Sequence, residues 1–174
     1  VANHTSNEFS WAKKALTGDV KYQGYYHIYP DRTIPDAFEK TLPEIFPMTS
    51  PGNFTFNIEM QKWVMTVFNR YQWDLNYSNP EVFIAMLGNL LKLANLGVDV
   101  VRLDALAFMW KKLDTLSQNL PEAHTLISLF RMCLQISAPG VVFLAEAIVA
   151  PNEIIKYFGS GPLKGNECEI AYNA

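Results

Sequence analysis

Two acidic residues stand directly after apolar, β-branched runs of the sequence. Asp104 follows the run VDVVRL, and Glu146 follows the run VVFLA. A carboxylate is costly to bury without a partner, and the carboxyl edge of a parallel sheet is where α/β proteins bind ligands. We therefore expect both side chains to point into one polar cleft and to do chemistry there. The alternative is that each carboxylate only caps the helix that follows its strand.

Arg102 precedes Asp104 by two residues, and side chains two apart project from the same side of a strand. A guanidinium in this position keeps a neighbouring carboxylate ionised and oriented, because an opposite charge within hydrogen-bond range favours the charged form. A purely structural salt bridge is the alternative interpretation. Asp99 is out of phase with this pair, so we assign it to the beginning of the strand and give it no catalytic role.

From residue 79 onward, apolar β-branched runs alternate with stretches of helical period, a pattern typical of βαβ units and a parallel sheet. The fold class is therefore predicted to be α/β. Asn79 and Pro80 form a helix start, and Gly97 is a stop signal. We predict strands over 98–104, 141–146 and 168–172, and helical stretches over 80–96, 107–113, 121 to about 138, and 151–158.

Residues 5–78 have no sustained period and are rich in aromatic residues. We predict one short helix that ends before Gly18 and a hairpin over 54–68 that turns near 59–61. A segment of this length without regular periodicity, residues 5–78, is best interpreted as a small domain of its own. His4 is predicted to end a strand that begins before the sequence does, and a lone His is more often structural than catalytic.

The composition excludes several classes of protein. Lys and Arg number 14 against 17 Asp and Glu, so no basic cluster exists that would favour nucleic acid. Cys133 and Cys168 lack the neighbouring ligands of a thiolate metal site. No apolar run reaches the length of a membrane span, so we expect no membrane partner. The chain begins without Met, and we interpret it as an excised piece, which leaves localisation and oligomeric state open.

Three segments in this order resemble signature regions of the α-amylase superfamily of retaining glycosidases and transglycosidases. The segments that flank these signatures resemble the amylosucrase branch of the superfamily. The resemblance covers nearly the whole chain. The signature segments are NH at 3–4, GVDVVRLDA at 97–105 and FLAEA at 143–147; the flanking ones are NHTSNE at 3–8, YPDR at 29–32, EIFP at 44–47, QWDLNYSNP at 72–80, LANLGVDV at 93–100 and AEAIV at 145–149.

The resemblance implies a role for each of five residues. Asp104 matches the catalytic nucleophile that forms a covalent glucosyl-enzyme, and Glu146 matches the general acid/base. Arg102 matches the arginine that supports the nucleophile. His4 matches the residue that hydrogen-bonds the sugar in subsite −1, and Phe68 matches an aromatic wall of that subsite. The chemistry agrees, because a retaining mechanism needs one ionised and one protonated carboxyl about 5 to 5.5 Å apart.

The resemblance also implies the fold and the domain organisation. Residues 1–4 and 79–174 would form part of a TIM (β/α)8 barrel, about strands 3 to 6. Residues 5–78 would form the domain B that this family inserts after its third strand. The family's third essential carboxylate is not among the 174 residues, so we expect this chain alone to be inactive.

The expected function is retaining α-glucosyl transfer or hydrolysis acting on sucrose and α-glucans. We expect no cofactor and no metal, because residues 5–78 lack the Asp cluster that a structural calcium needs. Pro43 stands where amylosucrases often have a basic residue at an acceptor site, which leaves acceptor preference open. The alternatives are a sucrose hydrolase, an α-glucosidase, a non-catalytic carbohydrate-binding homologue, and a nucleotide-binding domain, which would need a Gly-rich turn after residue 104.

Overall fold

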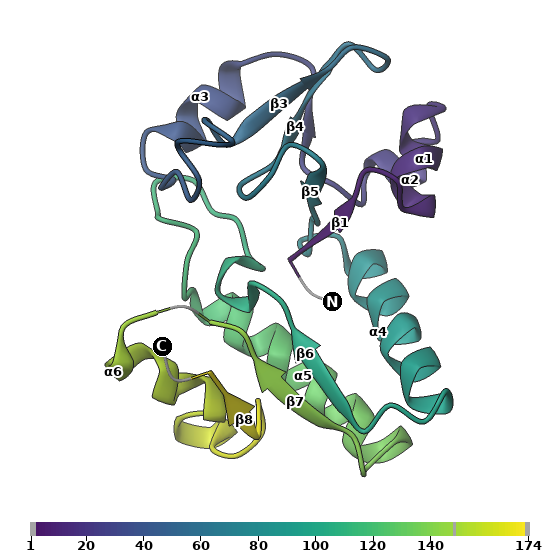
Figure 1. Ribbon diagram of the computed structural model, residues 1–174, viewed down its shortest axis with the longest axis vertical. Helices are drawn as coiled ribbons and strands as arrows, with labels where there is room; N and C mark the ends of the chain where they lie inside the picture. Colours follow the sequence, from purple (N-terminus) through teal and green to yellow (C-terminus); the bar gives the residue numbers. More distant parts are fainter. Residues whose placement is uncertain (1–2, 148, 173–174) are drawn as a thin grey trace. The chain divides into compact units, whose positions relative to one another are not determined.

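A computed structural model describes residues 3–147 and 149–172 (Figure 1). The chain divides into two compact units. The first comprises Asn3 with residues 83–110 and 118–172, and the second comprises residues 4–82 and 111–117. No helix within the described ranges has both the length and the hydropathy of a membrane span.

The first unit contains a parallel three-stranded sheet in the order β6-β7-β8. The predicted alternation is confirmed, because helix α5 connects β6 to β7 as a crossover between parallel neighbours. The strands are shorter than predicted. Their bounds are β6 Val100–Leu103, β7 Val142–Ala145 and β8 Ile170–Ala171, and the long helices are α4 Pro80–Asn95 and α5 Pro121–Ser137.

Helix α4 begins and ends where the capping residues of the sequence predict. The Asn79 side chain accepts a hydrogen bond from the Glu81 amide at 3.0 Å, and Pro80 takes the first helical position, where no amide donor is needed. Gly97 follows the helix with a φ of 85°, a conformation that glycine adopts without strain. Val82, Met86 and Leu90 form its buried stripe.

Helix α5 is fixed to the sheet by its apolar and charged contacts. Phe130 of α5 stacks on Phe83 of α4 with ring centroids 4.4 Å apart. Arg131 donates to the Val141 carbonyl at 3.0 Å and forms an ion pair with Glu169 at 2.5 Å. These contacts hold the beginnings of β7 and β8 to one helix.

The predicted helix over 107–113 is wrong. Only a 3₁₀ turn, η1 Leu106–Phe108, forms there. Residues 111–117 instead belong to the second unit, where the Lys111 side chain is buried against Asp74. The predicted helix over 151–158 divides into α6 Pro151–Ile154 and the 3₁₀ turn η2 Ile155–Phe158, and a further turn, η3 Gly161–Leu163, precedes β8.

The second unit is built from small sheets and short helices. The predicted hairpin is confirmed as β3 and β4, and β2 extends it to the order β2-β4-β3. The predicted short helix before Gly18 is confirmed as α1. The bounds are β1 His4–Ser6, α1 Ser10–Leu16, α2 Val20–Gln23, β2 Ile28–Tyr29, α3 Thr33–Glu39, β3 Phe54–Asn57, β4 Lys62–Met65 and β5 Gln72–Asp74.

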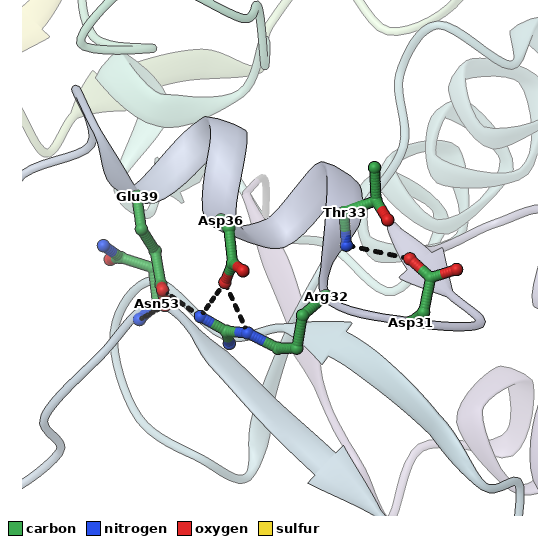
Figure 2. A network of polar contacts seen from close by, with 6 residues as sticks. All are labelled: Asp31, Arg32, Thr33, Asp36, Glu39 and Asn53. Atoms are coloured by element: carbon green, nitrogen blue, oxygen red, sulfur yellow. Dashed lines mark hydrogen bonds and ion pairs between the residues drawn. The ribbon is translucent and has the colours of Figure 1, made fainter.

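The YPDR segment holds α3 to the hairpin (Figure 2). Arg32 donates to Asp36 at 2.7 Å and also contacts Glu39. Its guanidinium lies over the Trp63 ring of β4, 4.6 Å from the ring centroid. Glu39 in turn accepts from the Asn53 amide at 3.2 Å. Within the second unit, this motif therefore acts as a structural clamp.

Candidate active site

The ends of β6 and β7 bring three of the predicted residues together in the first unit. The parallel register pairs Leu103 with Ala145, so Asp104 and Glu146, the next residues along each strand, emerge at the same carboxyl edge. The prediction that the two carboxylates share one edge of the sheet is confirmed.

Arg102 bridges the two carboxylates. Its Nη1 donates to Asp104 Oδ1, and its Nη2 lies 3.5 Å from Glu146 Oε1. The prediction that Arg102 and Asp104 share one side of the strand is thereby confirmed. The flanking residues Val101 and Leu103 are buried in the core on the opposite side.

The electrostatics of this cluster follow from its partial exposure. The side chains of Arg102, Asp104 and Glu146 are 45%, 30% and 19% exposed. Partial burial works against the cation, but the contacts with Asp104 and Glu146 prevail and raise the pKa of Arg102. The guanidinium therefore stays charged and orients both carboxylates from one side. The Tyr172 ring lies 5.9 Å from it.

A backbone donor completes the contacts of Glu146. The Ala105 amide donates to Glu146 Oε2 at 2.8 Å, and the Glu146 amide donates to the Leu103 carbonyl at 3.0 Å. Ala105 has φ 48° and ψ 36°, the left-handed conformation. Nothing in the sequence marks this contact, because an alanine has no functional side chain and the donor is a backbone amide.

His4 and Phe68 meet in the second unit. Their ring centroids are 5.4 Å apart, which confirms that Phe68 lies close to His4. Phe46 of the EIFP segment packs edge-on to Phe68 at 6.2 Å. The Gln72 amide group lies 2.5 Å from His4 Nε2.

His4 begins β1 of the second unit, which pairs antiparallel with β5. His4 was predicted to end a strand, but it begins one instead, because its backbone pairs with Asp74 of β5. Residues before Asn3 lie outside the described ones. The structure thus groups the five predicted site residues as Arg102, Asp104 and Glu146 in the first unit and His4 with Phe68 in the second.

The second unit contains a buried ion pair that was not predicted from the sequence. Lys111 Nζ lies 3.1 Å from Asp74 Oδ1, with side chains 0% and 1% exposed. Asp74 also accepts from the Val67 amide at 2.7 Å. Burial, reinforced by the Lys111 cation, lowers the pKa of His27 to about 3. Lys111 lies in an apolar stretch that was interpreted as helix, and its charge was the signal that a buried partner existed.

The described residues contain no cluster of three or more His, Cys, Asp or Glu side chains suited to a metal. Where β6 and β7 end, the first unit brings together two carboxyls and a guanidinium. One carboxyl can attack an electrophilic carbon while the other transfers a proton, the division of labour in retaining glycoside cleavage.

Comparison with known proteins identifies the family. The family described as "Alpha amylase, catalytic domain" matches residues 1–173. The chain therefore belongs to the alpha-amylase catalytic-domain family.

Relatives of known activity agree with this membership. The chain is 33% identical over 174 residues to the glucosylglycerate phosphorylase of Allomeiothermus silvanus, covering 99% of this chain and 30% of that protein. It is 34% identical over 175 residues to the trehalose synthase/amylase TreS of Mycolicibacterium smegmatis, covering 99% of this chain and 29% of that protein. The chain thus spans less than a third of the length of these relatives, whose activities differ from each other.

Solved structures show the fold. The trehalose-6-phosphate hydrolase of Bacillus licheniformis superposes with a TM-score of 0.82 at 19% identity, over 99% of this chain and 32% of that one. The isomaltulose synthase SmuA of Protaminobacter rubrum superposes with a TM-score of 0.77 at 23% identity, over 99% and 32%. The chain is an α/β segment of the TIM-barrel type found in this family.

Proposed function

We propose that residues 1–174 form part of the catalytic domain of a longer enzyme that transfers α-glucosyl groups with retention. The observation that carries this proposal is the bridging of two carboxylates by Arg102 where adjacent parallel strands end. Family membership supplies the reaction class. Residues 5–78 take the place of domain B in this proposal.

In the proposed reaction Asp104 is the nucleophile. Its carboxylate attacks the anomeric carbon while Glu146 gives a proton to the departing glycosidic oxygen, and the C–O bond breaks. An acceptor hydroxyl then attacks the anomeric carbon of the glucosyl-Asp104 ester, the bond between that carbon and the Asp104 oxygen breaks, and Glu146 takes up the acceptor's proton. Arg102 orients the Asp104 carboxylate for its attack on the donor.

His4 and Phe68 are proposed to contact the glucosyl ring. A polar imidazole held by Gln72 and a ring face of Phe68 supply one hydrogen-bonding and one apolar surface within 5.4 Å of each other. Sugar rings present both kinds of surface. This role is independent of the proton transfer proposed for Glu146.

We propose sucrose as the glucosyl donor and α-glucan chains as the acceptor. The support is the resemblance of YPDR, EIFP and QWDLNYSNP to the amylosucrase branch. The relatives favour two other donors, because their names specify trehalose and glucosylglycerate. Transfer to water, as in a sucrose hydrolase or α-glucosidase, differs only in the acceptor.

The test uses the full-length protein that contains these residues. It is incubated separately with sucrose, with trehalose, and with glucosylglycerate plus inorganic phosphate, and all products are quantified. Fructose release with growing glucan chains is the expected result. If the protein turns over only trehalose or only glucosylglycerate, sucrose is not the donor, but the proposed reaction class still stands.

Two matched variants test the catalytic roles. Asp104→Asn should abolish turnover of every donor, because the attacking carboxylate is lost. Asp99→Asn makes the same chemical change at an exposed carboxylate at the other end of the strand and should retain activity. Full activity of Asp104→Asn would contradict the proposed mechanism.

A further inference from the structure

Ala105 has a strained backbone conformation directly after the proposed nucleophile. Its φ of 48° costs an L-residue about 1 to 2 kcal/mol, and the residue is buried. Among the described non-glycine residues at positive φ, Ala105 alone has a side chain unable to hydrogen-bond. The others are Gln61, Asp114, Ser117 and Asn119. Such strain persists only where the surrounding structure enforces it, and it concentrates at functional sites.

The strained residue makes the turn that leaves β6. Its carbonyl accepts from the Phe108 amide at 3.0 Å and so begins the 3₁₀ turn η1. Its amide donates instead to Glu146 Oε2 at 2.8 Å. The chain thus changes direction within one residue while the amide at the end of β6 stays directed at the end of β7.

Glu146 is thereby held at two points from the end of β6. Its backbone amide donates to the Leu103 carbonyl, and its side chain accepts from Ala105. The Arg102 guanidinium at 3.5 Å is a weaker third contact. The distance from the Ala105 amide to the Glu146 carboxyl group, 2.8 Å, is shorter than the distance from Arg102.

We propose that Ala105 is a positioning residue whose amide stabilises the Glu146 carboxylate as its proton leaves for the glycosidic oxygen. The inference rests on the proposed function. A hydrogen bond to a carboxylate is stronger than one to a neutral acid, so the contact strengthens as the proton moves. The bond therefore lowers the barrier of the step that needs acid assistance.

The sharpest test replaces Ala105 with lactate in the full-length protein. This change keeps the methyl group and turns the amide N–H into an ester oxygen. Lactate at Ala107, two residues further along the same buried turn, is the matched control. The assay compares two donors, an alkyl α-glucoside that needs protonation of its leaving group and a dinitrophenyl α-glucoside that does not.

The expected result is a selective loss. Lactate at Ala105 should lower kcat for the alkyl glucoside by about tenfold or more, because a hydrogen bond to a charged group is lost, with KM nearly unchanged. The pre-steady-state rate of dinitrophenol release should change by less than about threefold. Lactate at Ala107 should show no such dependence on the leaving group. An equal loss for both donors would mean a structural role and would overturn the inference.

Ala105→Gly provides a second variant that does not depend on ester incorporation. Glycine adopts positive φ without strain, so the protein should become slightly more stable. The added backbone freedom should nevertheless lower kcat for the alkyl glucoside several-fold. A stabilised variant with undiminished kcat would overturn the inference.

The Asp104→Asn variant distinguishes a failure of the proposed function from a failure of the inference about Ala105. If it remains active on the dinitrophenyl glucoside, the proposed function is wrong. If it is inactive while lactate at Ala105 shows no dependence on the leaving group, only the inference about Ala105 is wrong.

Discussion

At the scale of single residues, the two units pair their charges in contrasting ways. The carboxylates contacted by Arg102 are partly exposed, so solvent screens their attraction. Lys111 and Asp74 are withdrawn from water, and each needs the other to offset its desolvation. The first arrangement leaves charges available to a substrate, whereas the second fixes the structure of its own unit.

Removing one member of the buried pair should be costly. Lys111→Met leaves Asp74 buried without its cation, and we expect a loss of about 3 to 5 kcal/mol in local stability. The double variant Lys111→Met/Asp74→Asn removes both charges and keeps an acceptor for the Val67 amide, so it should recover a good part of that loss. Hydrogen exchange of peptides covering residues 62–75 measures both. Additive losses would contradict the coupling.

His27 should make the second unit sensitive to acid. Its pKa is about 3 in the folded state, against 6.5 for an ordinary histidine. Between pH 3 and 6.5, His27 therefore binds a proton in the unfolded chain but not in the folded one. The contribution of neutral His27 to the free energy of unfolding is complete above pH 6.5 and is lost as the pH falls toward 3. The loss is at most about 1.4 kcal/mol per pH unit. Part of the His27 surface is accessible, so we expect a smaller slope.

The measurement is hydrogen exchange of the second unit at several pH values, corrected for the intrinsic rate. The control is His27→Gln, which cannot take up the proton. The variant should lose part of the dependence between pH 6.5 and 3. An unchanged dependence would mean that other groups cause it.

At the scale of elements, short polar signals set where the chain changes direction. Asn79 accepts from the Glu81 amide at the start of α4 and also donates to the Gly24 carbonyl at 3.0 Å. One side chain therefore begins the long helix and holds a loop of the second unit. The strained turn at Ala105 is the corresponding feature after β6.

Two substitutions at Asn79 separate its two contacts. Asn79→Asp keeps the capping acceptor and loses the donor to Gly24, whereas Asn79→Ala loses both. We expect Asn79→Ala to cost about 1 kcal/mol or more and Asn79→Asp clearly less. The change in Tm of the full-length protein measures the difference. Equal shifts would show that the contact with Gly24 dominates.

At the scale of the whole chain, the first unit exposes apolar side chains on both of its long helices and on its sheet. Within the described part of the chain, β7 is the one strand that pairs with β6, and the Asn3 amide donates to the Asp104 carbonyl just after β6 at 3.4 Å. Exposed apolar side chains occur on both long helices and on β6: Ile84, Val100, Leu129, Met132 and Ile136. Surface of this kind favours association.

Residues 1–174 purified alone should therefore self-associate and lack activity. The family resemblance places a third carboxylate outside these residues, and transition-state stabilisation needs the complete set. Size-exclusion chromatography measures the association, and release of nitrophenol from an aryl α-glucoside measures the activity. Release by the fragment above that of full-length Asp104→Asn would contradict the expectation.

The parallel α/β pattern, the hairpin, the bounds of α4 and the placement of Asp104 and Glu146 at strand ends could all be predicted from the sequence. These features depend on local periodicity and capping, which neighbouring residues specify. The remaining features depend on contacts between distant parts of the chain. Residues 111–113 do not continue the predicted helix, because Lys111 pairs with the buried Asp74 far away in the sequence. The Ala105 amide reaches Glu146 because their strands are paired. A contact between distant segments leaves no mark in local periodicity, because its energy is realised only when both segments are in place.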